Sequence, residues 1–349
     1  MTAVLDKKPP EHGEPGRGSS ERITALLRAR ELSIVLLIAV VVLVTTINNP
    51  HFLDSNSIQQ LLSGAALIAL LGVGETLVIV TRNVDLSVGS VLGLSAYIVG
   101  DLFKYNHIPV WSGFVIGTLV GVVIGAVNGF IVTVMRVPSL VVTLGMLYVI
   151  RGIDGVIVSG DRIDPSFIPS TFTAVGYKNL FGDPWLAIIV AVVVIAVGFA
   201  MRSFRASRDL YAIGSNPDAA ALAGVPIERR VFTAFVISGT LAGFAGALFL
   251  ALHTTIDNSG GAGYELKVVA AVVVGGVAIF GGSGTVFGAA LGAVLLNTIN
   301  QALVASRIDA FWNDAIAGAL LLAAIAFDRW LSLRVTRSLQ SAERAHREL

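Results

Sequence analysis

Cysteine is absent from the 349 residues of the chain, which excludes disulfide bonds and thiolate metal sites. The five histidines form no cluster, and neither paired catalytic carboxylates nor a nucleophile elbow occurs. The sequence therefore predicts no catalytic residue, no bound metal and no cofactor.

Charged residues are also scarce. They make up 13% of the chain, against 55% hydrophobic residues, whereas soluble domains carry roughly 25% charged residues. Such a chain cannot cover itself with an ordinary water-facing surface, so we expect a polytopic membrane protein in contact with lipid. The net charge is only +1 and the basic residues form no continuous stripe, which argues against a nucleic-acid partner.

Long apolar runs dominate the rest of the sequence. A transmembrane helix needs about 20 mainly apolar residues. This criterion gives ten segments, at residues 32–48, 58–80, 86–103, 110–134, 138–158, 185–201, 231–252, 267–280, 285–305 and 311–327. The predicted fold is an all-α, polytopic membrane helix bundle. The eighth segment is short, and Gly275 and Gly276 predict a bent or half-length helix that neighbouring helices cover.

Lysines and arginines indicate the orientation of the bundle. If the N-terminus is cytoplasmic, 18 of the 24 fall on the cytoplasmic side, and this bias favours both termini inside. The predicted division is a disordered cytoplasmic tail over residues 1–30, a transmembrane domain over 31–328 and a cytoplasmic tail over 329–349. A cytoplasmic loop at 202–230 interrupts the transmembrane domain.

Glycines recur at a spacing of four residues on three of the segments. They are Gly117, Gly121, Gly125 and Gly129 on the fourth, Gly239 and Gly243 on the seventh, and Gly284, Gly288 and Gly292 on the ninth. Small residues at this spacing let membrane helices approach until their backbones touch. We therefore expect a closely packed bundle.

The cytoplasmic loop at 202–230 contains a sequence typical of a very short helix. Asn216 suits the N-cap, Pro217 the first helical position and Asp218 the positive end of the helix dipole. Gly224 suits the left-handed residue that closes a helix. This short helix could bind another protein, or it could lie on the membrane surface.

Polar side chains at membrane depth are candidates for a solute pathway. Asn297, Asn300 and Gln301 lie on one face of the ninth segment. Amides there can hydrogen-bond a hydroxyl-rich solute, or simply a neighbouring helix. Asn128 and Thr143 are further candidates on the fourth and fifth segments.

Charged groups within the apolar segments also need an explanation. Glu75 lies well inside the second segment, where a buried hydrogen bond and a transport role are both plausible. Arg151 and Asp154, three residues apart, are spaced for an ion pair. Asp85, at the start of the third segment, is expected either to cap that helix through its side chain or to take part in gating.

The stretch from Thr81 to Ser90 follows an apolar segment and reads Thr-Arg-Asn-Val-Asp-Leu-Ser-Val-Gly-Ser. It resembles the hallmark of permease subunits of ATP-binding-cassette importers for ribose, arabinose, xylose and related sugars. The motif residues are Asp85, Leu86, Ser87, Gly89 and Ser90. Further motifs follow in the same order, and the likeness runs from about Phe52 to Asp328.

Arg82 and Asn83 stand where many of these permeases have two glycines. With the sequence Phe-Trp-Asn-Asp at residues 311–314, they make the chain similar to the branch that imports autoinducer-2 or rhamnose. Ribose- and xylose-type sugars are the next substrates that the resemblance suggests.

The resemblance implies a multi-pass protein of the bacterial inner membrane with three kinds of partner. A second permease, identical or paralogous, would pair with it, ATPase subunits would bind its cytoplasmic face, and an extracytoplasmic sugar-binding protein would deliver the solute. The loop at 202–230 would then supply the coupling helix that contacts the ATPases. Its residues would be Asn216, Pro217, Asp218, Ala219, Ala220 and Gly224.

The sequence itself contains no phosphate-binding Gly-x4-Gly-Lys-Ser/Thr loop. We therefore expect a transport subunit and not an enzyme, with ATP hydrolysed by a partner chain. Two alternatives remain open. One is an ion-coupled secondary transporter of a small polar solute, in which Glu75 would change its charge. The other is a membrane channel or scaffold.

Overall fold

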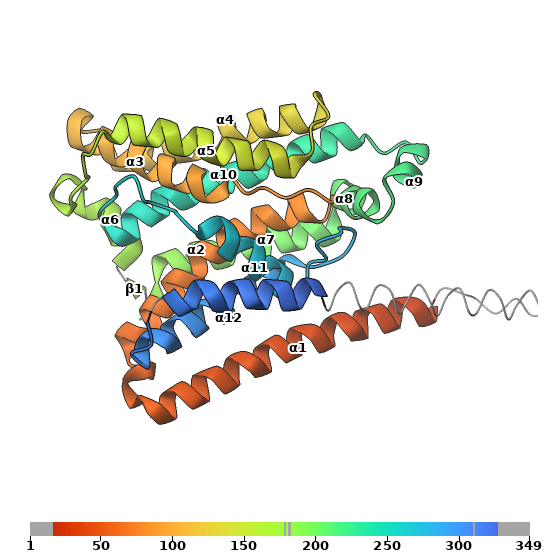
Figure 1. Cartoon of the computed structure of the whole chain (residues 1–349), viewed down its shortest axis with the longest axis horizontal. Helices are drawn as coiled ribbons and strands as arrows, with labels where there is room; N and C mark the ends of the chain where they lie inside the picture. The colour runs from red at the N-terminus through yellow and green to blue at the C-terminus, as the bar shows by residue number, and fades with distance from the viewer. Residues whose placement is uncertain (1–16, 178, 181–182, 310, 327–349) are drawn as a thin grey trace, which may run out of the picture.

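The computed structural model describes residues 17–177, 179–180, 183–309 and 311–326, and it is a bundle of helices (Figure 1). The predicted all-α fold class is confirmed. One antiparallel hairpin of β1 (Asn179–Leu180) and β2 (Asp183–Pro184) forms the only sheet among the described residues. Residues 1–16 and 327–349 lie outside the described part, so the assignment of the two tails remains a prediction.

Each of the ten predicted segments corresponds to a helix. The helices are α1 (Arg17–Asn48), η1 (Pro50–Leu53), α2 (Ser55–Ile79), α3 (Val88–Asn106), α4 (Val110–Thr133), α5 (Ser139–Val158), η2 (Pro165–Phe167), α6 (Ser170–Tyr177), α7 (Trp185–Ser203), α8 (Arg205–Ser215), α9 (Pro217–Leu222), α10 (Ile227–His253), α11 (Tyr264–Val274), α12 (Val286–Ala305) and a last helix, Phe311–Ala326. Within the described residues, seven helices are long and apolar enough to cross a membrane: α1 from Glu31, α2, α4, α5, α7, α10 and α12. The total number of crossings therefore remains a prediction.

Helix α1 begins at Arg17, within the stretch at residues 1–30 for which the sequence predicts disorder. The residues that follow Arg17 include several good helix formers, such as Glu21, Leu26 and Leu27. A helix that continues from the apolar run into this polar stretch needs no new nucleation, which is the physical reason for the earlier start.

The glycines expected to bring helices together do so between α4 and α10. A Cβ on Gly121 would overlap the carbonyl oxygen of Gly239, and a Cβ on Gly239 would overlap that of Gly121. Gly117 and Gly243 face each other in the same way. The backbones of α4 and α10 are therefore in direct contact, as the four-residue spacing predicts. Helix α12 approaches α11 similarly, with Gly288 against Gly275.

Two stretches of non-helical backbone enter the bundle from opposite ends (Figure 1). Residues 80–87 connect α2 to α3, and residues 254–263 connect α10 to α11. They meet where α3 and α11 begin, because a Cβ on Gly89 would overlap Gly261 and Glu265. Helix α11 has 11 residues and is therefore about 16 Å long, roughly half a membrane crossing. The prediction of a half-length eighth segment is confirmed.

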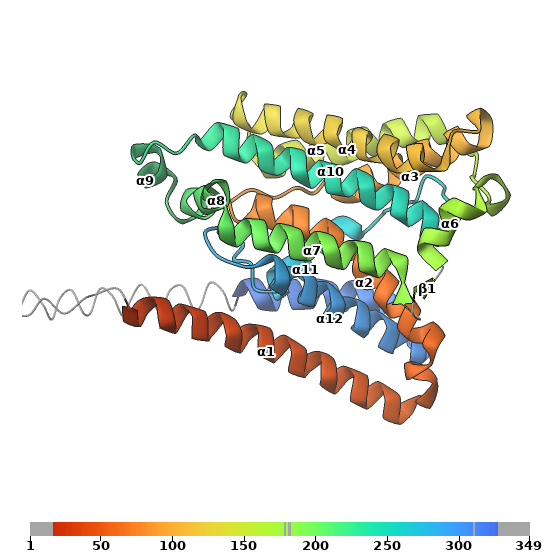
Figure 2. The same cartoon turned by 180° about the vertical axis from the view of Figure 1, so that it is seen from behind.

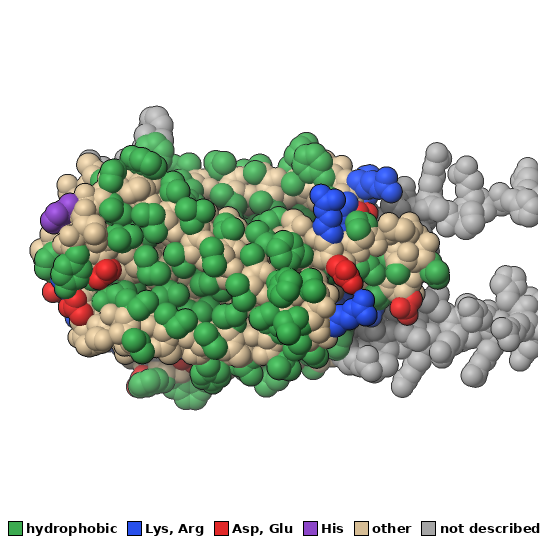
Figure 3. Space-filling model, turned by 90° about the horizontal axis from the view of Figure 1, so that it is seen from above, with side chains coloured by type: hydrophobic (Ala, Val, Ile, Leu, Met, Phe, Trp, Pro, Cys, Tyr) green, Lys and Arg blue, Asp and Glu red, His purple; other side chains and the backbone are tan. Residues whose placement is uncertain are grey.

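Helices α8 and α9 project from one end of the bundle, the end at which α1 begins (Figure 1, Figure 2). In Figure 3, lysine and arginine side chains gather at this end, while hydrophobic side chains cover the middle of the molecule. The position of the loop at 202–230 and of the N-terminus on the cytoplasmic side remains a prediction.

The contact between α4 and α10 leads to a stability prediction. In Gly121→Ala, the new methyl group would meet the backbone of Gly239, and overpacking of this kind costs about 1–3 kcal/mol. We expect a lower midpoint in thermal unfolding of the purified protein in detergent. Gly145→Ala on α5 is the control, because no atom lies within 4 Å of its Cβ position. Equal midpoints for the two variants would contradict the close contact.

Candidate translocation and coupling sites

The Asp85 side chain holds the segment at residues 80–87 inside the bundle. Its Oδ1 accepts hydrogen bonds from the Ser87 backbone N–H at 3.0 Å and from Ser87 Oγ at 2.6 Å. Its Oδ2 accepts one from Ser238 Oγ of α10 at 3.2 Å. The Asp85 N–H in turn donates to Glu75 Oε1 of α2 at 3.0 Å. Asp85 and Ser87 are both buried, so these bonds replace the water that the segment lacks.

The predicted capping role of Asp85 is wrong in its details. Ser87, not Asp85, stands at the N-cap of α3, and the Ser87 side chain makes no cap hydrogen bond. The Asp85 carboxylate instead bonds two residues ahead and across to α10. The cause is the depth of the segment, since a buried carboxylate needs several donors at once.

Two predicted pathway residues bind this same segment. Asn128 Nδ2 of α4 donates to Ser87 Oγ at 2.8 Å. The Thr143 hydroxyl of α5 shares its one proton between the Ser139 carbonyl of its own helix at 2.9 Å and the Val84 carbonyl of the segment at 3.2 Å. Both side chains are fully buried. The structure therefore places Asn128 and Thr143 where they support the segment, and it does not bring them to the cavity described next.

The remaining motif residues lie at the start of α3. Ser90 Oγ donates to the Ser87 carbonyl at 2.8 Å, and Gly89 packs against Gly261 of the opposite segment. Leu86 is half-buried. These residues thus form the junction between the two non-helical segments.

An amide-lined cavity of about 570 Å³ lies between α2, α10, α11 and α12. It brings together the three predicted residues of the ninth segment, Asn297, Asn300 and Gln301. The other residues that line it are Asn56, Gln59, Gln60, Ser63, Gly64, Leu252, His253 and Tyr264. The lining contains no lysine, arginine, aspartate or glutamate. Such a surface offers donors and acceptors without net charge when the histidine is neutral.

The three amides of α12 differ in their bonding. Asn297 Nδ2 donates to the Leu61 carbonyl of α2 at 2.7 Å, so this residue joins the two helices. The side chains of Asn300 and Gln301 make no hydrogen bond with the residues that the structure describes, and both are partly exposed to the cavity. These two side chains are therefore free to bind a solute.

A second cavity of about 400 Å³ adjoins the first and shares His253 and Tyr264 with it. Its wall is formed mainly by the segment at 254–263, with Arg162 and Phe249. The ring centroids of Phe249 and His253 lie 4.2 Å apart. His253 and Tyr264 thus stand between the two cavities. The sequence predicted a site role for neither residue.

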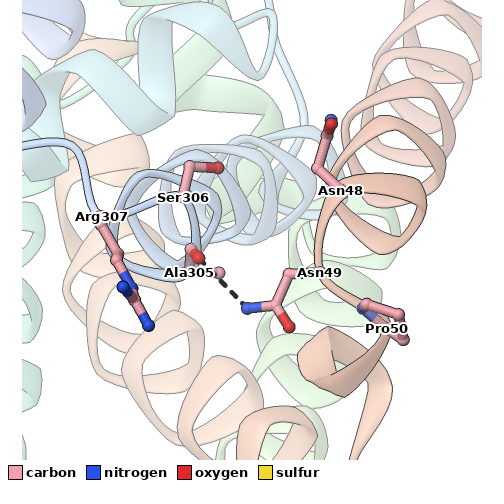
Figure 4. A pocket seen from close by; sticks show the side chains of 6 residues that line it. All are labelled: Asn48, Asn49, Pro50, Ala305, Ser306 and Arg307. Carbon is pink, nitrogen blue, oxygen red and sulfur yellow. Dashed lines mark hydrogen bonds between the residues drawn. The ribbon is translucent and has the colours of Figure 1, made fainter.

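A third cavity of about 600 Å³ lies apart from these two, where α1 and α12 end (Figure 4). Asn49 Nδ2 donates across it to the Ala305 carbonyl at 3.1 Å. Its lining also includes Asn48, Pro50, Ser306 and Arg307. None of the predicted site residues lines it. Among the described residues, no group of histidine and carboxylate side chains could hold a metal ion.

The short helix in the loop at 202–230 has the local structure that the sequence predicts. Asn216 Oδ1 accepts a hydrogen bond from the Ala219 N–H at 3.0 Å, Pro217 is the first helical residue, and Asp218 lies in the first turn. Gly224 has a φ of +77° and closes the helix. The role of these residues in coupling remains a prediction.

Two further features of α9 bear on coupling. Ala219 is exposed and Ala220 is buried, so the two predicted contact residues face different surroundings. Leu222 is 91% exposed, which makes it the apolar tip of the helix.

Helix α8, which the sequence did not reveal, supports α9. Asp209 on α8 forms an ion pair with Arg230 of α10 at 2.8 Å. The Tyr211 hydroxyl donates to the Gly284 carbonyl at 2.9 Å, and burial raises the pKa of Tyr211. The phenol therefore stays protonated as a donor. These two contacts fix α8 to α10 and to the loop before α12.

The predicted ion pair between Arg151 and Asp154 is not formed. Arg151 Nη1 instead donates to the Gly260 carbonyl at 2.6 Å. Neither carboxylate oxygen of Asp154 accepts a hydrogen bond from any described residue. The segment at 254–263 competes successfully for the guanidinium because its own buried carbonyls need donors.

The Asp85 network leads to a second stability prediction. Asp85→Ala would leave the Ser87 N–H and two hydroxyls without an acceptor, and each buried group left unpaired costs about 1–3 kcal/mol. We expect a large fall in the thermal unfolding midpoint in detergent. Asp164→Ala is the control, because the Asp164 side chain is 57% exposed and lies 3.6 Å from Arg162. A midpoint for Asp85→Ala that matches this control would refute the role of the network.

Comparison with known proteins identifies the family. The family model for the permease component of branched-chain amino acid transport systems matches residues 57–325. The autoinducer 2 import system permease protein LsrC of Klebsiella pneumoniae subsp. pneumoniae is 35% identical over 312 residues, covering 89% of this chain and 90% of the relative. The proteins of the same name from Enterobacter sp. (strain 638) and Yersinia pestis (strain Pestoides F) are 36% and 34% identical, over 89% and 84% of this chain and 90% and 83% of their own lengths.

No solved structure matches the chain. The family model covers most of the chain, from the start of α2 to the last described helix. The helices it covers form both the amide-lined cavity and the loop at 202–230. The resemblance to importer permeases is thereby confirmed. The chain belongs to the family of permease components of branched-chain amino acid transport systems, and it is a multi-pass permease of the bacterial inner membrane.

Proposed function

We propose that this chain is the membrane subunit of an ATP-binding-cassette importer for autoinducer-2 or a similar small, uncharged, hydroxyl-rich solute. The observation that carries the proposal is the cavity lined by neutral amides between α2 and α12. The names of the relatives, which are autoinducer-2 import permeases, favour this solute over ribose- or xylose-type sugars.

The chemistry of the cavity supports an uncharged substrate. An amide side chain can both donate and accept, so it matches a hydroxyl group in either role. A charged solute at membrane depth would need an opposite charge to offset its desolvation, and the cavity lining offers no lysine, arginine or carboxylate. The unbonded amides of Asn300 and Gln301 are the best-placed contacts.

The sequence and the end of the bundle that carries α8 and α9 both bear on the source of energy for transport. The sequence contains no phosphate-binding loop, so ATP would be hydrolysed by partner subunits. Helix α9 presents the exposed Leu222 at its tip, and the exposed Arg205 and Arg208 lie on the neighbouring α8. An apolar tip beside basic residues suits a pocket on an ATPase subunit. A second permease and a solute-binding protein would complete the importer.

Ion coupling is the less well supported mechanism. It would need Glu75 to change its charge during transport, but Glu75 Oε1 is occupied by the Asp85 N–H. Glu75 also does not line the amide cavity. Its other oxygen, Oε2, is buried without a hydrogen-bond partner among the described residues, so the side-chain hydrogen bond of Glu75 is the one with the segment at 80–87.

The role of the cavity can be tested with Asn300→Leu. Loss of one amide that contacts the solute should raise the KM for autoinducer-2 uptake by roughly 5- to 30-fold, since a hydrogen bond to a neutral group contributes about 1–1.5 kcal/mol and the unpaired solute hydroxyl adds to the loss. Uptake of labelled solute by cells expressing the complete importer would be measured, with the amount of permease in the membrane determined alongside.

Ser306→Ala is the matched control, because Ser306 follows the same helix but lines a different cavity. Wild-type uptake kinetics in Asn300→Leu, at equal protein level, would remove this cavity from the pathway.

The role of α9 can be tested with Leu222→Glu. Leu222 is 91% exposed, so the permease should fold normally, while a carboxylate at the tip should disrupt an apolar contact. We expect the ATPase subunits to be lost during affinity purification of the tagged permease. Ile308→Glu changes an exposed apolar residue far along the chain in the loop after α12 and should retain them. Unchanged co-purification with Leu222→Glu would mean that α9 is not the docking helix.

A further inference from the structure

Arg82 connects the non-helical segment at 80–87 directly to the end of α8. Its Nε donates to the Gly214 carbonyl at 2.5 Å, and its Nη2 donates to the Ser215 carbonyl at 2.8 Å. Gly214 and Ser215 are the last residues of α8, and Asn216, the N-cap of α9, follows at once. One side chain therefore spans from the buried segment to the base of the docking helix.

The backbone around Arg82 is arranged for this contact. Arg82 has a φ of +66°, in the left-handed region that non-glycine residues seldom adopt. A Cβ on Gly214 would overlap the Val80 carbonyl oxygen, and the Gly282 N–H donates to that same oxygen at 2.9 Å. The end of α2, the end of α8 and the loop before α12 are thus in contact at one point.

Only two residues separate Arg82 from Asp85, whose carboxylate bonds to Ser238 of α10. Asn128 of α4 and Thr143 of α5 bond to the same segment. A displacement of the α8 end would reach α4, α5 and α10 through this short stretch, because the Arg82 guanidinium joins α8 to the segment and hydrogen bonds join the segment to those three helices.

We propose that Arg82 is the positioning residue that transmits movement of α9 to the segment at 80–87 during transport. This inference rests on the proposed function, in which α9 binds an ATPase subunit. The two charge-assisted hydrogen bonds of the guanidinium make the end of α8 and the segment at 80–87 move as one unit. Both bonds would have to break before α8 could move without the segment.

A purely structural role is the competing explanation. A cation beside the last carbonyls of a helix stabilises that helix, and this would hold whether or not α9 moves. The two roles differ in their consequences. Loss of a stabilising contact lowers the unfolding midpoint. Loss of a contact that transmits movement uncouples ATP hydrolysis from solute uptake.

The experiment uses the complete importer in liposomes, with its ATPase subunits, its solute-binding protein and autoinducer-2. In Arg82→Met the side chain keeps an unbranched stem but loses the guanidinium group and all its donors. We expect normal assembly and a retained basal rate of ATP hydrolysis. Uptake, and the stimulation of hydrolysis by loaded binding protein, should both fall roughly tenfold or more, the scale expected for two charge-assisted bonds. Arg82→Lys can restore at most part of the pairing and should give intermediate values.

Arg136→Met is the matched control. Arg136 also has a left-handed φ, +57°, beside the end of a helix. Its side chain is 82% exposed and, among the described residues, pairs with Glu228 at 3.3 Å and not with α8. It should leave uptake and stimulation unchanged. If Arg82→Met retains wild-type uptake and stimulation, or if it affects them no more than Arg136→Met, the inference is wrong.

Two other outcomes are equally decisive. A fall in uptake that merely follows a lower unfolding midpoint, in Arg82→Met and Arg82→Lys alike, would assign Arg82 a structural role and overturn the inference. Failure of the wild-type permease to bind ATPase subunits at all would instead contradict the proposed function, so the two failures can be told apart.

Discussion

The Asp85 carboxylate is the contact on which this structure depends. A stretch of backbone without helical hydrogen bonds is tolerated at membrane depth only where protein groups replace water. Asp85 does this by accepting bonds from Ser87 and Ser238 while its own N–H is held by Glu75. Because the segment is held, α3 can begin inside the bundle and meet the start of α11 at Gly89 and Gly261.

The buried and half-buried polar side chains of the bundle have two different roles. Asn128, Thr143 and Asn297 are bonded to backbone or side chains and fix one helix to another. Asn300 and Gln301 make no hydrogen bond with the described residues and face the amide-lined cavity. A polar group that is already bonded gains little from a solute, whereas an unbonded one gains a full hydrogen bond. Polar side chains that are already hydrogen-bonded therefore hold the helices together, and those without a partner are the candidates for binding solute.

The sequence predicted features that depend on local order. The apolar runs predicted the ten segments, and the capping residues Asn216 and Gly224 predicted α9. The four-residue spacing of glycines predicted the contact of Gly121 with Gly239. Contacts between distant segments could not be derived. Arg151 lies three residues from Asp154 but bonds to Gly260 of the segment at 254–263. Residue spacing within α5 cannot show that this distant segment packs beside it. The α2 side of the cavity was missed for the same reason.

The central claim is that this bundle moves an uncharged solute through a neutral cavity with energy supplied by a partner. The most direct measurement is accumulation of labelled autoinducer-2 by liposomes that contain the complete importer. We predict accumulation when ATP is present on the α9 side with loaded binding protein opposite, and none when a proton gradient is imposed without ATP. Accumulation driven by the gradient alone, with no ATPase subunit present, would contradict the account.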